Sequence, residues 1–526
     1  MIEPWQNEQQ WRSDGVLMDA LDPLLPAFGK QPLFDADVIV VGTGSGGATT
    51  ARYLARGGFK VLMVDSGPFL TAQDFNGSDN LYLKLYKNGL LHSTHDGDIN
   101  LLQGECVGGS ATINWTSSFR LPSNVLDYWQ AHFGLTGLHY TELASAFNEM
   151  EALTGVAPWT APPNENNAML AAGAKKLGWH FGAVPRNVKG CWDLGFCGLG
   201  CPTNAKQSPL VTSVPDVLAH GGALLYNAPV VRVLHDGNRA HGVVLKNGLA
   251  LKARHLVLAA GAINTPGLLL SSGLQPQMPN VGRRTFLHPS CFSLARFHQD
   301  INPFYGAPQS VYSDQFLVAP DSDNANRMAF KLEAVPLQPV LAAGLFAQHG
   351  KALTVDMGQL ANTQGMIALL RDGFGDDTGG VVKLDRQQAR LSYPVSERLK
   401  ASAKQALLEM ARCQFAAGAY EVRPACLSAT QWFQSFDKLS HFLSTTSFRQ
   451  YDLTLGSAHL MGGCGLGDAA HGAVVDAQGF ALGLGQLSIV DASVFPTSLG
   501  VNPQLTIMAF SRIFARHIEK RLQTAA

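Results

Sequence analysis

The feature that most constrains the fold of this chain is a short apolar run that leads directly into a glycine-rich turn. The run covers residues 37–41, and the turn reads Gly-Thr-Gly-Ser-Gly-Gly at 42–47. A predicted helix at 48–55 and a second apolar strand at 60–64 complete a strand–helix–strand unit. Such a unit favours dinucleotide binding, because its first turn and helix N-terminus face a pyrophosphate.

The glycines of this turn have separate predicted tasks. Gly42 permits the tight turn, Gly44 lets backbone amides reach the phosphates, and Gly47 lets helix and strand pack closely. Asp65 ends the second strand about twenty residues after Gly44, where a carboxylate accepts hydrogen bonds from an adenosine ribose. The unit does not separate NAD from FAD, so that choice depends on other segments.

Composition excludes several classes of function. The 526 residues carry 39 Lys and Arg against 40 Asp and Glu, a formal charge of -1, so neither nucleic acid nor an anionic membrane is an expected partner. Hydrophobic residues make up 46% and charged residues 15%, which predicts a large core divided among two or three units.

The sequence also indicates a location. The first thirty residues lack a basic start and apolar run, and no later apolar stretch reaches the roughly 20 residues of a membrane span. We therefore expect no signal peptide and no membrane span, and a location in the cytoplasm or peripheral to the inner membrane.

Three distant segments decide the cofactor: a second glycine-rich stretch at 104–115, a strand turning into a helix at 255–266, and a strand ending in an acid at 487–496. With these, the sequence resembles the glucose-methanol-choline (GMC) flavoprotein oxidoreductases, and within them the long-chain alcohol oxidase branch. The resemblance rests on GTGSGG at 42–47, GGSATIN at 108–114, AAGAINTP at 259–266, NVGRRTFLHP at 280–289, SAHLMGGC at 457–464 and VDASVFPTSLGVNPQLTIMAF at 490–510.

The resemblance implies FAD as the cofactor. It places Asp65 at the adenosine ribose, Val231 beside the adenine, and 108–114 along the flavin, with Asp491 near the ribityl-pyrophosphate. The implied cofactor-binding residues are Gly42, Gly44, Ser45, Gly46, Gly47, Asp65, Gly108, Gly109, Asn114, Val231, Gly261, Asp491, Ala492, Asn502 and Pro503.

Oxidation of an alcohol by a flavin needs a base for the hydroxyl proton, and histidine suits that task near neutral pH. His459 matches the catalytic histidine of the family, and Asn502 stands at the partner position. An amide can bind the substrate oxygen but cannot act as a base, so we expect His459 to take the proton. The pair Asn502-Pro503 also predicts the start of a helix at 504–520.

Cys191, Cys197 and Cys201 lie within eleven residues, in the spacing C-x5-C-x3-C-P. This spacing resembles that of sugar and polyol dehydrogenases of the same family, which hold a [3Fe–4S] cluster. Reduced structural thiols, a disulfide, or zinc with a distant fourth ligand such as His180 or His220 are the alternatives.

The predicted fold is mixed α/β, with a Rossmann-like FAD-binding domain and an interleaved substrate-binding domain on a largely antiparallel sheet. The predicted limits are 1–34 for an N-terminal extension, 35–125, 205–290 and 450–526 for the FAD-binding domain, and 126–204 and 291–449 for the substrate-binding domain with the cysteines.

The predicted reaction is oxidation of a hydrophobic primary alcohol to the aldehyde, with the apolar stretch 333–346 as a pocket wall for an alkyl chain. A quinone, a cytochrome or a small subunit is the expected electron-accepting partner. An iron–sulfur sugar or polyol dehydrogenase is the first alternative, and a non-redox member of the family, either a lyase or a non-catalytic protein, is the second.

Overall fold

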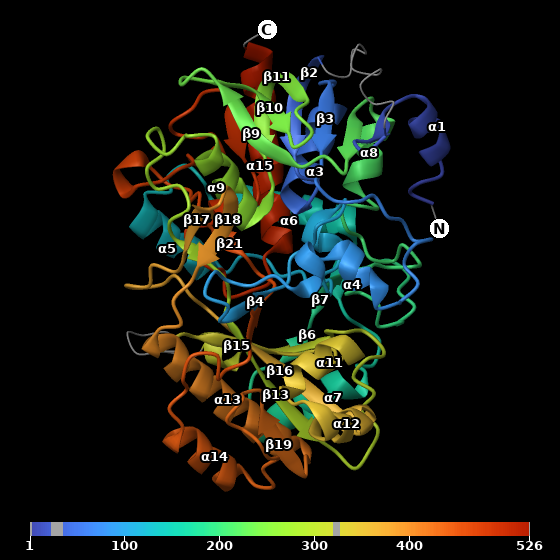
Figure 1. Ribbon diagram of the computed structural model, residues 1–526, viewed down its shortest axis with the longest axis vertical. Coiled ribbons are helices and arrows are strands. Elements are labelled where there is room, and N and C mark those ends of the chain that lie inside the picture. Colours follow the sequence, from blue (N-terminus) through green and yellow to red (C-terminus); the bar gives the residue numbers. More distant parts are fainter. Residues whose placement is uncertain (1–2, 23–34, 319–326, 525–526) are drawn as a thin grey trace.

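The computed structural model describes residues 3–22, 35–318 and 327–524. Much of the predicted N-terminal extension, 1–2 and 23–34, therefore lies outside the described residues. Figure 1 shows one sheet in the upper part of the molecule and a second in the lower part, where helices α7, α13 and α14 also lie.

The first sheet has eight strands in the order β1-β8-β3-β2-β11-β10-β9, with β22 also paired to β11. Every pairing from β1 to β11, and that of β22, is parallel, while β11, β10 and β9 run antiparallel. The strands are β1 (Leu17–Asp19), β2 (Asp35–Val41), β3 (Val61–Val64), β8 (Ala223–Tyr226), β9 (Val230–His235), β10 (Ala240–Leu245), β11 (Ala250–Leu258) and β22 (Leu487–Ile489).

The centre of this sheet is apolar on both faces. Val38, Ile39 and Val40 of β2 are fully buried, as a continuous β-branched run in a covered parallel sheet requires. Helix α3 (Ser45–Arg56) begins directly after the glycine turn and packs against α8 (Ser213–Ala219) and α15 (Gln504–Thr524). The turn at 42–44 therefore lies at the carboxyl end of β2, where ligands of such sheets bind.

The second sheet has eight strands in the order β4-β20-β13-β16-β15-β14-β6, with β19 paired to β13. Its pairings are antiparallel except that of β20 with β4. The strands are β4 (Ile99–Leu101), β6 (Gly182–Ala183), β13 (Ser290–Arg296), β14 (Val311–Ser313), β15 (Phe330–Ala334), β16 (Thr363–Leu370), β19 (Glu421–Pro424) and β20 (Leu455–Ser457).

Because side chains alternate along each strand, the two faces of the second sheet have different surroundings. On one face, side chains such as Cys291, Leu332 and Ala368 pack beneath α7 (Glu165–Leu177) and α13 (Glu397–Ala417). The opposite face lines a cavity with residues two apart: Ser290 and Phe292 on β13, Ile367 and Leu369 on β16, and Glu333 on β15 with Val335 just beyond its end. The predicted fold class is confirmed, and the antiparallel sheet supplies one wall of the cavity.

The remaining elements surround these two sheets. The apolar stretch at 333–346 divides into the end of β15 and the helix α11 (Pro339–Phe346). The other elements are α1 (Glu8–Ser13), α4 (Asn80–Leu85), η2 (Lys87–Leu90), η3 (Gly109–Thr112), α5 (Ser123–Phe133), α6 (Tyr140–Thr154), β5 (Val156–Pro158), β7 (Pro185–Asn187), α9 (Gly261–Ser271), β12 (Thr285–Phe286), α10 (Gln315–Val318), α12 (Gly350–Gly358), η4 (Leu360–Asn362), β17 (Val381–Asp385), β18 (Gln388–Ser392), α14 (Phe436–Thr445), β21 (Met461–Gly462), η5 (Ala469–His471) and η6 (Ala492–Val494).

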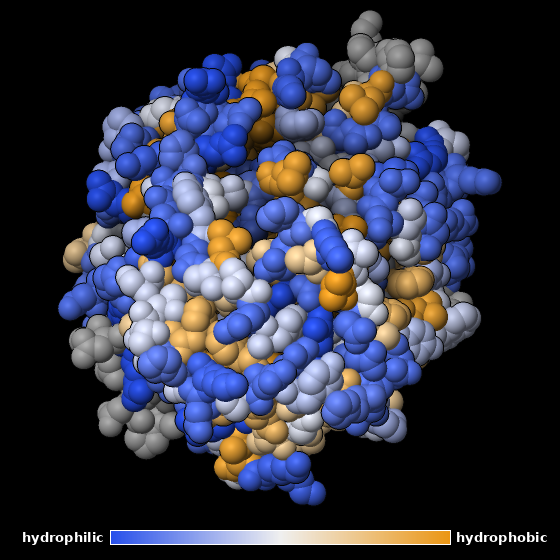
Figure 2. All heavy atoms as spheres, turned by 60° about the horizontal axis from the view of Figure 1, so that its bottom comes forward, coloured by the Kyte–Doolittle hydropathy of each residue, from blue (hydrophilic) through white to orange (hydrophobic). Residues whose placement is uncertain are grey.

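Hydrophilic side chains cover most of the face drawn in Figure 2, with apolar side chains in small groups between them. In the part of the chain that the structure describes, no helix combines the length and apolar character needed to cross a membrane.

Candidate active site between the two sheets

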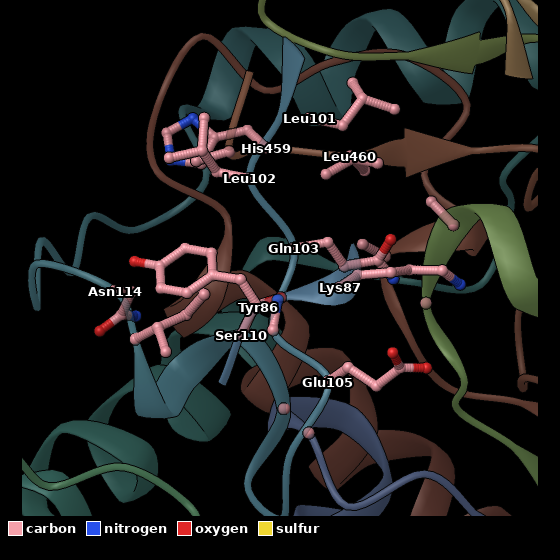
Figure 3. Close-up of a pocket in the computed structure, with 18 of the residues that line it drawn as sticks. Tyr86, Lys87, Leu101, Leu102, Gln103, Glu105, Ser110, Asn114, His459 and Leu460 are labelled. Carbon is pink, nitrogen blue, oxygen red and sulfur yellow. The ribbon is translucent and has the colours of Figure 1, made fainter. Parts of the chain in front are cut away.

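A single cavity of about 830 Å³ runs from the glycine turn to the face of the second sheet. Figure 3 shows side chains from separate segments around it, among them Lys87, Asn114 and His459. Most of the residues assigned from the sequence line this cavity: Gly42, Gly44, Ser45, Gly46, Asp65, Gly109, Asn114, Val231, Gly261, His459, Asp491, Ala492, Asn502 and Pro503. Gly47 and Gly108 are not part of the lining.

The glycine turn is held by close backbone contacts on three sides. A Cβ on Gly42 would lie 2.3 Å from the carbonyl oxygen of Ala259, and one on Gly46 would lie 2.1 Å from that of Val490. Gly44 differs, because a Cβ there would meet only the Cα of Gly109, at 3.9 Å. The chain itself leaves open space over Gly44, and this space belongs to the cavity.

Asp65 is buried and already holds the turn together. Its carboxylate accepts hydrogen bonds from the backbone N–H of Thr43 at 2.8 Å, from the Thr43 hydroxyl and from the N–H of Gly67 at 2.9 Å. A carboxylate has about four acceptor sites, so one remains for a ligand hydroxyl. Burial raises the pKa of Asp65, and the three hydrogen bonds oppose that rise.

Asp491 plays a similar part on the other side of the turn. Its carboxylate accepts the N–H of Gly261 at 2.8 Å and that of Ser493 at 2.8 Å, as well as the Thr265 hydroxyl. The acid that ends β22 therefore ties the first turn of α9 to η6. This explains why Gly261, Asp491 and Ala492 line one region of the cavity.

The far end of the cavity carries a polar cluster. The imidazole Nε2 of His459 lies 3.4 Å from the amide Nδ2 of Asn502, and the amide Oδ1 accepts a hydrogen bond from Lys331 Nζ at 3.2 Å. Lys331 is 1% exposed and pairs at 2.8 Å with Glu333, which is fully buried. Burial lowers the pKa of His459 to about 4, so its ring is neutral near pH 7.

Sequence reasoning missed Lys331, Glu333 and Lys87 as site residues. Lys331 and Glu333 stand two residues apart on β15, so alternation places both on one face, and Glu333 lines the cavity. The sequence pattern that could have identified them is two opposite charges, two residues apart, directly before the apolar stretch 334–347. Lys87 also lines the cavity, and its Nζ donates to Asn264 Oδ1 at 2.9 Å.

The three clustered cysteines lie apart from this cavity, around a separate void of about 20 Å³. All three are free thiols, and within the described ranges no group of three or more His, Cys, Asp or Glu side chains is placed to hold a metal ion. The segment still touches the main site, because Lys206 Nζ donates to the carbonyl of Asn114 at 2.8 Å and also to that of Cys197. The structure thus gives no support to the predicted [3Fe–4S] cluster.

A glycine turn of the dinucleotide type is thus joined by one cavity to a buried histidine and amide beneath an antiparallel sheet. Patterns of the GMC oxidoreductase family match residues 82–290 and 379–511. The chain belongs to this family.

Individual relatives agree with this assignment. A long-chain-alcohol oxidase of Arabidopsis thaliana is 31% identical over 517 residues, covering 93% of this chain and 68% of that protein. An uncharacterized GMC-type oxidoreductase of Mycobacterium tuberculosis is 32% identical over 487 residues, covering 90% and 74%.

Solved structures share the fold. Pyridoxine 4-oxidase from Mesorbium loti superposes with a TM-score of 0.67 at 18% identity, over 92% of this chain and 99% of that one. Formate oxidase from Aspergillus oryzae gives a TM-score of 0.68 at 16% identity, over 94% and 99%.

The residues around the glycine turn fit FAD, the cofactor of this family. The open space over Gly44 is one that a Cβ would fill, and backbone N–H groups at the start of α3 border it. We therefore predict that Gly44→Val removes FAD without unfolding the protein. Gly44 has φ −65°, which a side chain tolerates. The variant should purify colourless with a circular dichroism spectrum like that of the parent.

Two further glycine variants control this experiment. Gly358→Val at the end of α12 meets no atom within 4 Å and should keep full FAD. Gly46→Ala should lower stability, because its Cβ overlaps the backbone of Val490. A folded Gly44→Val protein with stoichiometric FAD would contradict the assignment of the pyrophosphate site.

Two buried histidines predict acid lability. Burial lowers the pKa of both His255 and His459 from 6.5 to about 4. Between these values the unfolded chain binds protons that the folded chain does not, so stability rises with pH across this window and is lost as pH falls from about 6.5 to 4. His255→Asn should reduce this loss by about 2 kcal/mol, measured by urea unfolding at pH 7 and pH 4.5. An equally steep loss in the variant would contradict the prediction.

Proposed function

We propose that this protein oxidises a hydrophobic primary alcohol to the aldehyde, with FAD lying in the cavity from Gly44 to Asn502. The observation that carries the proposal is the meeting of a polar cluster and an apolar wall in one cavity. The polar cluster is His459, Asn502 and Glu333, and the wall belongs to the second sheet and α11. When bound, FAD supplies the acceptor for the hydride of the alcohol.

The apolar wall suits an alkyl chain. Phe292, Val335, Ile367 and Leu369 face the cavity from the second sheet, and α11 adds further residues: Val340, Leu341, Gly344 and Leu345. Each buried CH₂ group contributes about 0.8 kcal/mol to binding. A sugar would leave several hydroxyls without partners against this wall, at a cost of about 1–3 kcal/mol each. This favours an alkyl alcohol over a sugar or polyol.

The polar cluster can hold the alcohol oxygen and receive its proton. Asn502 lines the cavity; its amide Oδ1 accepts from Lys331 Nζ, and its Nδ2 lies 3.4 Å from Nε2 of His459. Two side chains are candidates for the proton: His459, which is neutral near pH 7, and Glu333, whose Oε2 has no hydrogen-bond partner among the described residues. His459 was the expected base from the sequence, and Glu333 is added by the geometry.

The substrate class predicts a chain-length series. From butanol towards dodecanol, each added CH₂ should raise kcat/KM about three- to four-fold until the cavity is full, while glucose and sorbitol should be at least about a hundred-fold poorer. Leu345→Trp should move the best chain length to shorter alcohols by filling part of the wall. Val355→Trp, on the exposed side of α12, should leave it unchanged. A flat alcohol series with saturable sorbitol turnover would overturn the proposal.

The polar cluster predicts the effect of two further variants. His459→Ala and Glu333→Gln should each retain FAD and slow its anaerobic reduction by alcohol about 10²- to 10⁴-fold, the usual range for proton transfer by a positioned group. His471→Ala, in the partly exposed η5, is the control and should reduce at the parental rate. Stopped-flow absorbance measures all three. Reduction within a few-fold of the parent in both cluster variants would exclude this cluster as the reacting site.

A further inference from the structure

Helix α11 forms the part of the alkyl wall that no strand supplies. Val340 and Gly344 lie one turn apart, are both exposed and both line the cavity, so this edge of the helix borders the cavity mouth. Leu341 and Leu345, each one residue further along, also line the cavity. The position of α11 therefore determines how much apolar surface an alkyl chain can contact.

Hydrophobic contacts hold α11 against the second sheet. Ala342, Leu345 and Phe346 belong to a cluster that also contains cavity-facing side chains of β13 and β16, and this cluster is separate from the two large cores. Hydrophobic attraction has no preferred direction. Such contacts keep α11 on the wall, but they do not by themselves fix its position along the wall.

Helix α12 follows α11, and the two lie side by side in the lower part of the molecule (Figure 1). Among the residues of α12 only Asp356 is buried, at 4% exposure. Leu353 and Met357 add partly buried contacts to the cluster beneath α11. A helix that docked by its apolar face alone would bury those side chains and leave the carboxylate outside. The attachment of α12 thus depends on a charge.

Three donors hold the Asp356 carboxylate. Its Oδ1 accepts from Arg296 Nη2 at 2.7 Å and from Trp432 Nε1 at 3.1 Å, and its Oδ2 accepts from Arg423 Nη2 at 2.8 Å. Arg296 lies on β13 and Arg423 on the neighbouring β19. Both guanidinium groups also lie over the Trp432 ring, 3.9 and 4.6 Å from its centroid. This network joins α12 to two paired strands of the second sheet.

Arg423 also reaches the end of α11. The same Nη2 donates to the backbone carbonyl of Phe346, the last residue of α11, at 3.0 Å. An Nη nitrogen carries two N–H groups, so one is available for each acceptor. A single nitrogen on a side chain that is 3% exposed therefore connects α11 and α12 to β19.

The other end of α11 is attached by a neutral side chain. Gln338, which precedes the helix, donates from Nε2 to the carbonyls of Phe304 at 2.9 Å and Gly195 at 3.2 Å. If the attachment at Arg423 is lost, α11 keeps this contact and can swing about it. The end of α11 that carries Leu345 would then move furthest from the wall.

We propose that Arg423 and Asp356 are positioning residues that fix α11 against the alkyl wall and thereby set the selectivity for long alkyl chains. The inference rests on the proposed alcohol oxidation and concerns its substrate range. A buried charged network is satisfied only when its members keep one arrangement, so it fixes a position that apolar contacts leave free. When α11 shifts, the alkyl chain loses apolar contacts to water, and each CH₂ group contributes less to binding.

Alkyl selectivity is the direct test. Asp356→Asn keeps the shape of the side chain and removes its charge. The ratio of kcat/KM for decanol to kcat/KM for butanol should fall at least about tenfold in this variant. The loss should appear in KM for decanol, with the limiting rate of flavin reduction within about three-fold of the parent, because alkyl contacts stabilise substrate and transition state equally.

Glu421→Gln is the matched control. Within the described part of the chain, the Glu421 carboxylate bonds to Arg296 Nη1 at 2.8 Å and to no residue of α11 or α12. The variant removes a carboxylate from the same network, so it should lower the urea midpoint as Asp356→Asn does. It should leave the decanol-to-butanol ratio at the parental value. An equal fall of the ratio in Glu421→Gln would overturn the role of Asp356.

A second variant covers the case in which Asp356→Asn does not fold. Arg423→Lys keeps a positive charge beside Asp356, but an ammonium lacks the planar fork that reaches Asp356 and Phe346 together. It should lower the decanol-to-butanol ratio in the same way. A parental ratio in folded Arg423→Lys would overturn the proposal.

Hydrogen exchange of the holoenzyme separates this inference from the proposed function. Peptides that cover 339–358 should exchange at least about fivefold faster in Asp356→Asn and Arg423→Lys, and at the parental rate in Glu421→Gln. Parental exchange in a folded Asp356→Asn or Arg423→Lys protein would overturn the fixing of α11. If no alcohol reduces the parental flavin while exchange is faster in these variants, the proposed function fails and the fixing of α11 by Arg423 and Asp356 stands.

Discussion

The rest of the site depends on a steric constraint at the glycine turn, where three backbone segments meet without side chains between them. Gly42 lies against Ala259, Gly46 against Val490, and Gly47 against Gly42 itself, each too close for a Cβ. These contacts bring the ends of β2, β11 and β22 to one point, although β2 and β22 lie at opposite ends of the sequence. Asp65 and Asp491 then tie the flanking turns together through backbone hydrogen bonds.

The opposite end of the cavity is held by charge rather than by close packing. Lys331 and Glu333 are both buried, and an ion pair in such surroundings is stable only if the partners stay together. Lys331 also fixes the orientation of Asn502, so the pair on β15 controls an amide that precedes α15. The second sheet thereby orders a residue that directly precedes α15, a helix that packs against α3 beside the first sheet. The two parts of the molecule form one site only when packed together.

Much of the fold and of the cofactor region could be predicted from the sequence. The strand, the turn and the helix of residues 37–55 follow from local periodicity and glycine spacing, and the structure forms them as β2 and α3. Asp491, His459 and Asn502 were assigned to the site from family motifs, and all three line the same cavity. The limits of the domains and the roles of these residues stay predictions. The cysteine cluster was harder, because spacing along the chain says nothing about whether three thiols can converge on a metal.

What the sequence determined by itself was the set of local units and the family: a dinucleotide-binding turn, a histidine and asparagine of the GMC type, and an apolar stretch near residue 340. The tertiary structure alone decided which groups act on one another. Lys331 and Asn502 are 171 positions apart, as are His288 and His459, so neither contact leaves a local pattern in the sequence. The ring of His288 is also held by a third segment, at Gly500, through a backbone N–H that every residue except proline carries. A hydrogen bond from such a group is specified by the fold, so the residue type at position 500 does not predict it.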